Sequence, residues 1–251
     1  MKNEQRTMYI RVPITKYGWP QVIVYPAIVL VIMVVFPLGT QAFLPLWAII
    51  SIEAVLGIVL IWILMFFRDP ERRCPLDSEL LLAPADGKIT DIEMVEENNF
   101  IGGTALRIGI FLSIFNTHIN RAPCNVRIER ITYKKGKYIN AMNPQSGRVN
   151  ESNDISLIRT DNPQVRLIVR QISGAIARRI VCDKVEGQEL AGGEKFGMIK
   201  FGSRTELYLD ARQETSCEFK CLVQIGDKVK AGLTPLVKYE IRDKRDAAIK
   251  N

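Results

Sequence analysis

Residues 192–211 read GGEKFGMIKFGSRTELYLDA, and they predict two β-strands joined at Gly202-Ser203. The runs on either side of this junction are rich in the branched, aromatic and alternating residues that strands favour. A Gly-Ser pair between strands is most often a surface turn. It is also a bond at which the serine hydroxyl can attack the preceding carbonyl, convert the amide into an ester and so lead to a cut chain. The surrounding sequence has to decide between these two interpretations.

Strand-like runs of the same kind fill the chain beyond residue 80. They cover residues 88–95, 104–113, 126–133, 155–160 and 165–172, and more follow in residues 218–241. The turn Asp161-Asn162-Pro163 predicts a hairpin, and glycine-containing turns separate the last strands. We therefore expect a mainly β fold, an antiparallel sandwich or barrel-like domain with few short helices.

Two long apolar segments precede this domain. Residues 19–39 carry no charged side chain, and residues 43–67 carry only Glu53. A helix needs about 20 apolar residues to cross a bilayer core. Pro26 and Pro37 interrupt the first segment, so its apolar run is marginal for a full span. A second apolar segment follows at once, which argues against a cleaved signal peptide. We expect a retained α-helical transmembrane hairpin.

Charges around the hairpin predict its topology. Basic residues lie on both sides of it: Lys2, Arg6, Arg11, Lys16, Arg68, Arg72 and Arg73. Since positively charged flanks stay in the cytoplasm, both ends of the hairpin and the β-rich domain should lie on the cytoplasmic side of the membrane. The chain then divides into a membrane anchor (residues 1–67), a charged linker (68–79) and a β-rich domain (80–251).

Composition narrows the classes of partner. The chain has 34 Lys and Arg against 27 Asp and Glu, a net charge of +7, which suits a domain near anionic lipid head groups. It lacks the basic and aromatic patterns of nucleic-acid binding, so we expect no nucleic-acid partner. Its five cysteines are odd in number and scattered: Cys74, Cys124, Cys182, Cys217 and Cys221. With one histidine and no paired cysteines, the sequence predicts free thiols and no metal site.

Three separated segments carry the residue types that activate a serine. Asp86 lies in the turn PADGK before a strand, and His118, the single histidine, lies in a polar loop directly after another strand. A serine nucleophile needs a base, and the base needs a group that orients its second nitrogen. A lone histidine is more often a packing or surface residue, but the polar neighbours of His118 and its place at a strand end favour a base. Asp86, His118 and Ser203 supply the residue types that this chemistry needs.

Together, these segments resemble the phosphatidylserine decarboxylase family, in particular its shorter bacterial and archaeal branch. The resemblance covers about residues 75–240 and includes VRQISGAIARRIVC at residues 169–182. The best-known members of the family carry LGST at the cleavage point, where this chain has FGSR at residues 201–204. The Gly-Ser pair that the chemistry uses is retained, and the flanking change affects only the details of the pocket.

The resemblance implies a self-cleaving proenzyme in which Asp86, His118 and Ser203 form the processing triad. His118 would take the proton of Ser203, and the serine would attack the carbonyl of Gly202. Cleavage would give a large chain, residues 1–202, and a small chain, residues 203–251, which begins with a pyruvoyl group. That group, rather than pyridoxal phosphate or a metal, would form a Schiff base with phosphatidylserine, and loss of CO₂ would yield phosphatidylethanolamine. A homodimer is also implied.

Contacts to the membrane lipid substrate are expected from basic and apolar side chains near the cleavage point. The candidates for the lipid phosphate are Arg121, Arg178 and Arg179, and those for an apolar pocket wall are Phe196, Met198 and Phe201. An ordinary basic surface and an ordinary strand core would use the same residue types.

Other functions remain open on the sequence alone. An archaetidylserine decarboxylase would use the same chemistry on an ether lipid. A non-catalytic, membrane-anchored module with a lipoyl-like hairpin would explain GDKVKAG at residues 226–232 but not the Gly-Ser pair. A serine hydrolase would retain a free Ser203 hydroxyl, although no Gly-x-Ser-x-Gly elbow surrounds this serine.

Overall fold

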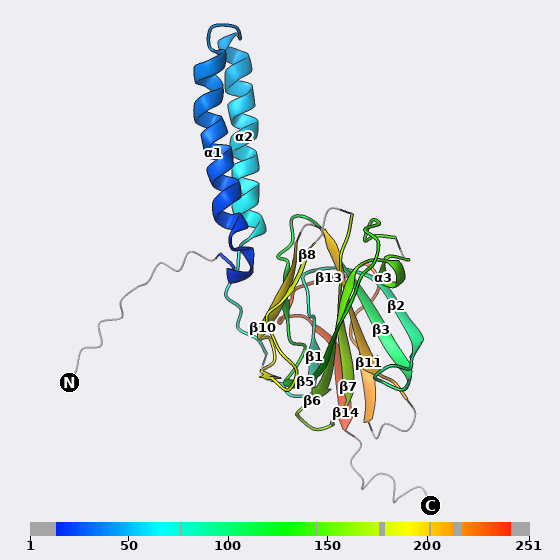
Figure 1. The fold of residues 1–251 in the computed structure, drawn as a ribbon. Helices are drawn as coiled ribbons and strands as arrows, with labels where there is room; N and C mark the ends of the chain where they lie inside the picture. Colours follow the sequence, from blue (N-terminus) through cyan, green and yellow to red (C-terminus); the bar gives the residue numbers. More distant parts are fainter. Residues whose placement is uncertain are drawn as a thin grey trace, which may run out of the picture. The chain divides into compact units, whose positions relative to one another are not determined.

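The computed structural model describes residues 14–75, 77–143, 145–175, 179–200, 202–212 and 217–241 (Figure 1). The chain forms two compact units, which meet in sequence between Glu71 and Arg72. The first unit contains the apolar segments, and the second contains the strands.

Two helices make up most of the first unit. Helix α1 (Gln21–Thr40) and helix α2 (Leu46–Phe66) follow a short 3₁₀ turn, Lys16–Gly18, and pack side by side as a hairpin. Helix α1 continues through both of its prolines, so the apolar run is not broken there. Both helices are long and apolar enough to cross a membrane, by length and composition. Large apolar side chains cover their outer surfaces, which suits lipid better than water.

A curled sheet, which has eight strands, dominates the second unit (Figure 1). Its strands are β2 (Gly87–Glu97), β3 (Gly103–Leu112), β5 (Val126–Lys134), β6 (Ser152–Arg159), β7 (Arg166–Ile172), β9 (Glu189–Leu190), β11 (Ser203–Asp210) and β13 (Lys228–Val229). Their order across the sheet is β13-β2-β3-β11-β7-β6-β5-β9, and every pairing is antiparallel. The predicted mainly β, antiparallel fold is confirmed.

Two smaller sheets and one helical turn complete the unit. One sheet has the order β4-β10-β8, from β4 (Ile119–Arg121), β10 (Lys195–Lys200) and β8 (Arg179–Cys182). The other has the order β1-β14-β12, from β1 (Leu80–Leu82), β14 (Pro235–Ile241) and β12 (Cys217–Cys221). Helix α3 (Ser146–Val149) is a single turn.

Strand β11 shows how the large sheet is buried on both faces. Because side chains alternate along a strand, Leu207 and Leu209 point to one face, where they join the main apolar core. Arg204 and Glu206 point to the other face, where they are buried in a network of charges. Ser203 lies on the same face as the leucines, at the end of the strand.

Candidate active site

Ser203 is buried at the first position of β11. It pairs with Leu112 of β3, its exposed fraction is 0%, and its Oγ has no hydrogen-bond partner among the described residues. A buried hydroxyl without a partner costs free energy, on the order of 1–3 kcal/mol, and therefore calls for a functional explanation. The structure excludes the exposed surface turn, and it leaves Oγ free to react.

Gly202 precedes the strand in a conformation that suits glycine. Its φ is +68°, in the left-handed region that L side chains rarely adopt. The chain bends at this residue and then enters the ladder of β11 at Ser203. No side chain at residue 202 obstructs the carbonyl of the Gly202-Ser203 bond, which is the bond predicted to be cut.

His118 lies against the backbone N–H of Gly202, which belongs to the peptide group before the Gly202-Ser203 bond. It directly precedes β4, it is fully buried, and its Nε2 accepts a hydrogen bond from the N–H of Gly202 at 3.4 Å. Since a peptide N–H can only donate, Nε2 is an acceptor, and in the neutral ring Nδ1 carries the proton. Nδ1 then donates to the carbonyl of Asn116 at 2.9 Å. The lone pair of Nε2 is therefore turned toward the backbone N–H of Gly202, the residue directly before Ser203.

Asp86 lies at the same end of the sheet, in the loop between β1 and β2. Lys88, Phe111 and Arg204 are in register across β2, β3 and β11, so Asp86 and Ser203 lie near the same edge. The carboxylate of Asp86 accepts two hydrogen bonds from Arg72, at 2.5 and 2.7 Å, and one from the N–H of Ala231 at 2.8 Å. These are its hydrogen bonds among the described residues. The expected pairing of Asp86 with His118 thus stays a prediction.

A buried hydrogen bond that sequence reasoning missed joins the two sheets beside this site. Nδ2 of Asn120 in β4 donates to Oγ1 of Thr205 in β11 at 3.1 Å, and both side chains are fully buried. Asn120 follows His118 by two residues, and Thr205 follows Ser203 by two. The bond therefore connects β4, which directly follows the histidine, to β11, which begins with the serine. Because side chains alternate along a strand, the residues two positions after His118 and Ser203 face the same side as these two, and this pattern in the sequence could have pointed to the pair Asn120 and Thr205.

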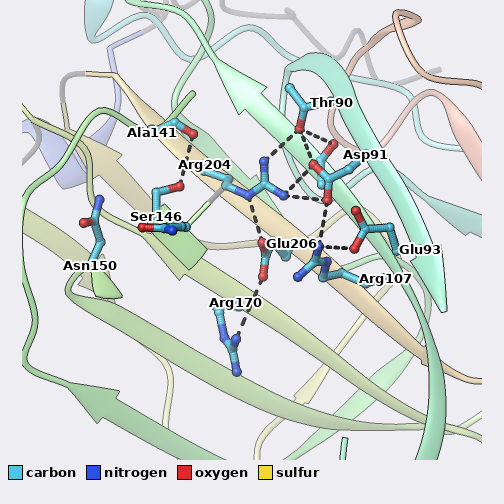
Figure 2. A network of polar contacts seen from close by, with 12 residues as sticks. Thr90, Asp91, Glu93, Arg107, Ala141, Ser146, Asn150, Arg170, Arg204 and Glu206 are labelled. Carbon is cyan, nitrogen blue, oxygen red and sulfur yellow. Dashed lines mark hydrogen bonds and ion pairs between the residues drawn. The ribbon is translucent and has the colours of Figure 1, made fainter. Parts of the chain in front are cut away.

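The opposite face of β11 carries a buried ionic network (Figure 2). Arg204, which is 2% exposed, donates to both carboxylate oxygens of Asp91 at 2.7 and 2.6 Å, to Glu206 at 2.8 Å and to Thr90 at 2.8 Å. Burial acts to raise the pKa of Asp91, but hydrogen bonds from Arg204 and Thr90, and the charges of Arg204 and Arg107, hold it below its ordinary value. The residue after Ser203 is thereby fixed from three directions.

The basic candidates for substrate binding are placed differently from one another. Arg121 is 5% exposed and donates to the carbonyl of Gly193 at 2.9 Å, so its side chain supports the local backbone. Arg179 is exposed on β8, opposite Lys200 of β10. Burial and the charge of Arg179 lower the pKa of Lys200, which is 3% exposed and was not predicted. Arg178 lies outside the described residues.

The apolar candidates are buried strand residues. Phe196 is 1% exposed and belongs to the main apolar core. Met198 is fully buried in β10, where it pairs with Ile119 of β4 and Val181 of β8. Phe201 lies outside the described residues.

The described cysteines bear out the expectation of free thiols. Cys74, Cys124, Cys182 and Cys221 are free. Burial raises the pKa of Cys124 to about 12, so this thiol stays protonated and unreactive near neutral pH. Within the described ranges, no group of three or more His, Cys, Asp or Glu side chains could hold a metal ion.

The serine hydroxyl is buried and has no partner among the described residues, and a histidine lone pair faces the N–H of the residue before it; such an arrangement suits an enzyme site. Comparison with known proteins identifies which enzyme family this is. The chain matches the family model of phosphatidylserine decarboxylase over residues 59–236.

Relatives named "Phosphatidylserine decarboxylase proenzyme" cover most of the chain. The one from Pelodictyon phaeoclathratiforme is 35% identical over 226 residues, 90% of this chain and 99% of that protein. The one from Desulfotalea psychrophila is 40% identical over 203 residues, 79% of this chain and 91% of that protein. The one from Rhodopirellula baltica is 43% identical over 178 residues, 70% of each. This chain belongs to the phosphatidylserine decarboxylase family and is a decarboxylase, a carboxy-lyase.

Proposed function

We propose that this protein converts phosphatidylserine to phosphatidylethanolamine by means of a pyruvoyl group that it makes from Ser203, by cutting its own chain before that residue. Family membership supports the overall reaction. The observation that carries the residue assignment is the buried Oγ of Ser203, which has no partner among the described residues. Ser203 directly follows Gly202, whose φ is +68°. His118, against the N–H of that glycine, supplies the base.

Self-cleavage begins at the carbonyl carbon of Gly202. Oγ of Ser203 bonds to this carbon while its proton passes to Nε2 of His118. The C–N bond then breaks and the nitrogen takes up the proton, so that an ester to the serine side chain replaces the amide. Loss of the α-hydrogen of residue 203 expels the Gly202 carboxylate and cuts the chain. Water finally replaces the nitrogen, which leaves as ammonia, and a ketone remains at residue 203.

The site fits the pyruvoyl group because Ser203 is buried beside an apolar strand and its Oγ has no contact to lose. The ketone supplies a carbonyl that captures the substrate amine and accepts the electron pair left behind when CO₂ departs. His118, which contacts the N–H of the neighbouring Gly202, would return a proton to the substrate in this proposal. Lys200 and Arg179 place positive charge on neighbouring strands a few residues from the cut, where an anionic head group can bind.

The cut halves stay together because of where their strands lie. The small chain would begin with β11, which is hydrogen-bonded between β3 and β7 in the interior of the large sheet. Its last strand, β14, pairs with β1 of the large chain. Separation would require breaking several strand pairings and exposing Leu207 and Leu209 of the core.

The two apolar helices support a membrane location near the lipid substrate. Basic residues flank the hairpin on both sides, and on this basis we place the β-rich domain on the cytoplasmic side. A homodimer is proposed from the family resemblance. Cross-linking of the detergent-solubilised protein, and protease protection of Arg73 in oriented vesicles, test these two points separately.

The mass of the C-terminal fragment tests the cleavage. We expect two chains from the parent protein, with a small chain that starts at residue 203 and carries a ketone in place of the serine amine. Ser203→Ala should remain one uncut, inactive chain of 28.4 kDa. Borohydride should inactivate the cut enzyme by reducing the ketone. An uncut parent chain that decarboxylates phosphatidylserine would refute the proposal.

Three alternatives given by the sequence are distinguished as follows. A serine hydrolase would leave Ser203 open to fluorophosphonate probes, whereas the pyruvoyl enzyme should not react with them. The non-catalytic binding module is disfavoured by membership in a decarboxylase family. Parallel assays with ester-linked and ether-linked serine lipids decide between phosphatidylserine and archaetidylserine as the substrate.

A further inference from the structure

Gly174 lies directly against the carbonyl group of Gly202. It follows β7 by two residues and is buried. A Cβ atom added to Gly174 would lie 2.2 Å from the carbonyl oxygen of Gly202 and 3.2 Å from its carbonyl carbon. Contacts under 3.0 Å are essentially never seen for real Cβ atoms, so one of the two backbones would have to move. The scissile carbonyl thus occupies the space that a side chain at residue 174 would take.

The backbone on the Gly174 side is held firmly. Ser173 donates twice to the carbonyl of Glu151, from its N–H at 2.9 Å and from its Oγ at 3.0 Å. Its own carbonyl accepts from Nδ2 of Asn150 at 2.8 Å, and all three side chains are buried. Gly174 therefore cannot retreat without breaking several buried hydrogen bonds, each of which is costly to leave unmade.

The backbone around Gly202 is held on both sides of its carbonyl group. The N–H of Gly202 contacts Nε2 of His118, and Ser203 is paired with Leu112 in the β11 ladder. Arg204 is anchored in the buried ionic network. Between these points, the carbonyl of Gly202 is the group that can rotate, because the left-handed glycine allows it. A side chain at residue 174 would turn that carbonyl.

We infer that Gly174 is a positioning residue for self-cleavage, and that its missing side chain sets the orientation of the carbonyl that Ser203 attacks. This inference rests on the proposed function. To reach ordinary contact from 2.2 Å, the oxygen would have to move by about 1 Å, and a misplacement of about 1 Å at a reacting centre can cost on the order of 100-fold in rate. Gly174→Ala should slow formation of the ester about 100-fold.

The experiment follows cutting of the full-length chain after pulse labelling, in detergent or nanodiscs, for the parent and Gly174→Ala. Circular dichroism and gel filtration confirm that the uncut variant is folded. Hydroxylamine, which cleaves esters but spares amides, shows whether the first step has taken place. We expect Gly174→Ala to remain uncut over many parent half-times and to resist hydroxylamine at residue 202. Gly192→Ala, whose added Cβ meets its nearest atoms at an ordinary 3.4 Å, should be cut like the parent.

Two further variants separate the carbonyl contact from general crowding. A Cβ at Gly174 would also lie 3.3 Å from Cβ of Ala141. If the carbonyl contact is decisive, Gly174→Ala combined with Ala141→Gly stays slow, and restored cutting in this pair would overturn the inference. If Gly174→Ala does not fold, Ser173→Ala loosens the same backbone without adding bulk. It should slow cutting several-fold, and an unchanged rate would count against the inference.

The outcomes distinguish this inference from the function on which it rests. Cutting of Gly174→Ala at the parent rate, or a hydroxylamine-sensitive ester in that variant, would overturn the role of Gly174 and leave self-cleavage intact. A parent chain that is never cut before Ser203 would refute the proposed function, and the inference with it.

Discussion

Removing the guanidinium of Arg204 should destabilise the β-rich unit strongly. Its side chain is 2% exposed and neutralises Asp91 and Glu206, whose side chains are 18% and 1% exposed (Figure 2). Removing one partner of a buried ion pair typically costs about 3–5 kcal/mol. In Arg204→Ala, Glu206 would keep the hydroxyl of Tyr208 at 2.6 Å, and Asp91 would keep Arg107 at 3.3 Å. Because these contacts remain, we expect the free energy of unfolding to fall by an amount near the lower end of this range, about 3 kcal/mol.

The assay is thermal unfolding of the detergent-solubilised full chain, in a Ser203→Ala background so that the chain stays in one piece. A loss of about 3 kcal/mol should lower the midpoint by roughly 6–12 °C for a unit of this size. Arg127→Ala is the matched control, because its partner Glu129 is on the surface and exposed pairs contribute about 0–1 kcal/mol. Equal midpoints for Arg204→Ala and Arg127→Ala would refute the reasoning.

The difference in unfolding midpoint between the Ser203→Ala background and Arg204→Ala in that background should depend on pH in one direction. The folded pKa of Asp91 is lowered, so its ion pair contributes stability above the unfolded pKa of about 4 and loses it as pH falls through the folded value. The gap in midpoint between the parent background and Arg204→Ala should therefore narrow below about pH 4. A gap that widens on acidification would contradict the assigned charge states.

Three further substitutions test the site itself. Thr205→Val removes the oxygen that accepts the inter-sheet hydrogen bond, and it should slow chain cutting about tenfold in pulse-chase gels, the effect of roughly 1–1.5 kcal/mol. Thr205→Ser should restore the parent rate. Equal cutting rates for Thr205→Val and the parent would argue against a role of this bond. Lys200→Met should raise the KM for phosphatidylserine in mixed micelles at little change in kcat per cut chain, whereas a fall in kcat alone would exclude head-group binding. Arg72→Gln leaves the carboxylate of Asp86 without its cation and should lower decarboxylation at least tenfold, while the exposed neighbour Arg73→Gln should not.

Local patterns in the sequence predicted most of the strands. Alternation and turn residues located β2, β3, β5, the hairpin of β6 and β7, and the strand pair around Gly202. Strands of two to four residues, such as β4 and β8, are too short to show a period of two, and they were missed. The prolines of α1 suggested an interrupted span, but the helix continues through them, so its apolar length is greater than the sequence pattern indicated.

Contacts between distant segments could not be predicted in the same way. Ser203 and His118 were predicted because their chemistry is rare and specific, and the structure places His118 against the N–H of Gly202, the residue before Ser203. The pairing of Arg72 with Asp86 joins the linker to a loop, and nothing local in either segment indicates it. The close approach of Gly174 to the scissile carbonyl is equally invisible in sequence, because a glycine after a strand has many ordinary uses.

In the proposed self-cleavage, the position of the Gly-Ser bond at the start of β11 would let this one peptide bond react while the fold persists. Beyond Ser203 the strand is held by β3 and β7 at its edges and by Arg204 on the face opposite the apolar core, so residue 203 cannot follow a moving carbonyl. The change from amide to ester must then be accommodated on the other side of the bond, by Gly202, whose backbone tolerates the rotation. The same rigidity would keep the new end of the small chain in place after the proposed cut. A Gly-Ser bond in the middle of a strand would lack the free carbonyl, and one in an open loop would lack the fixed hydroxyl.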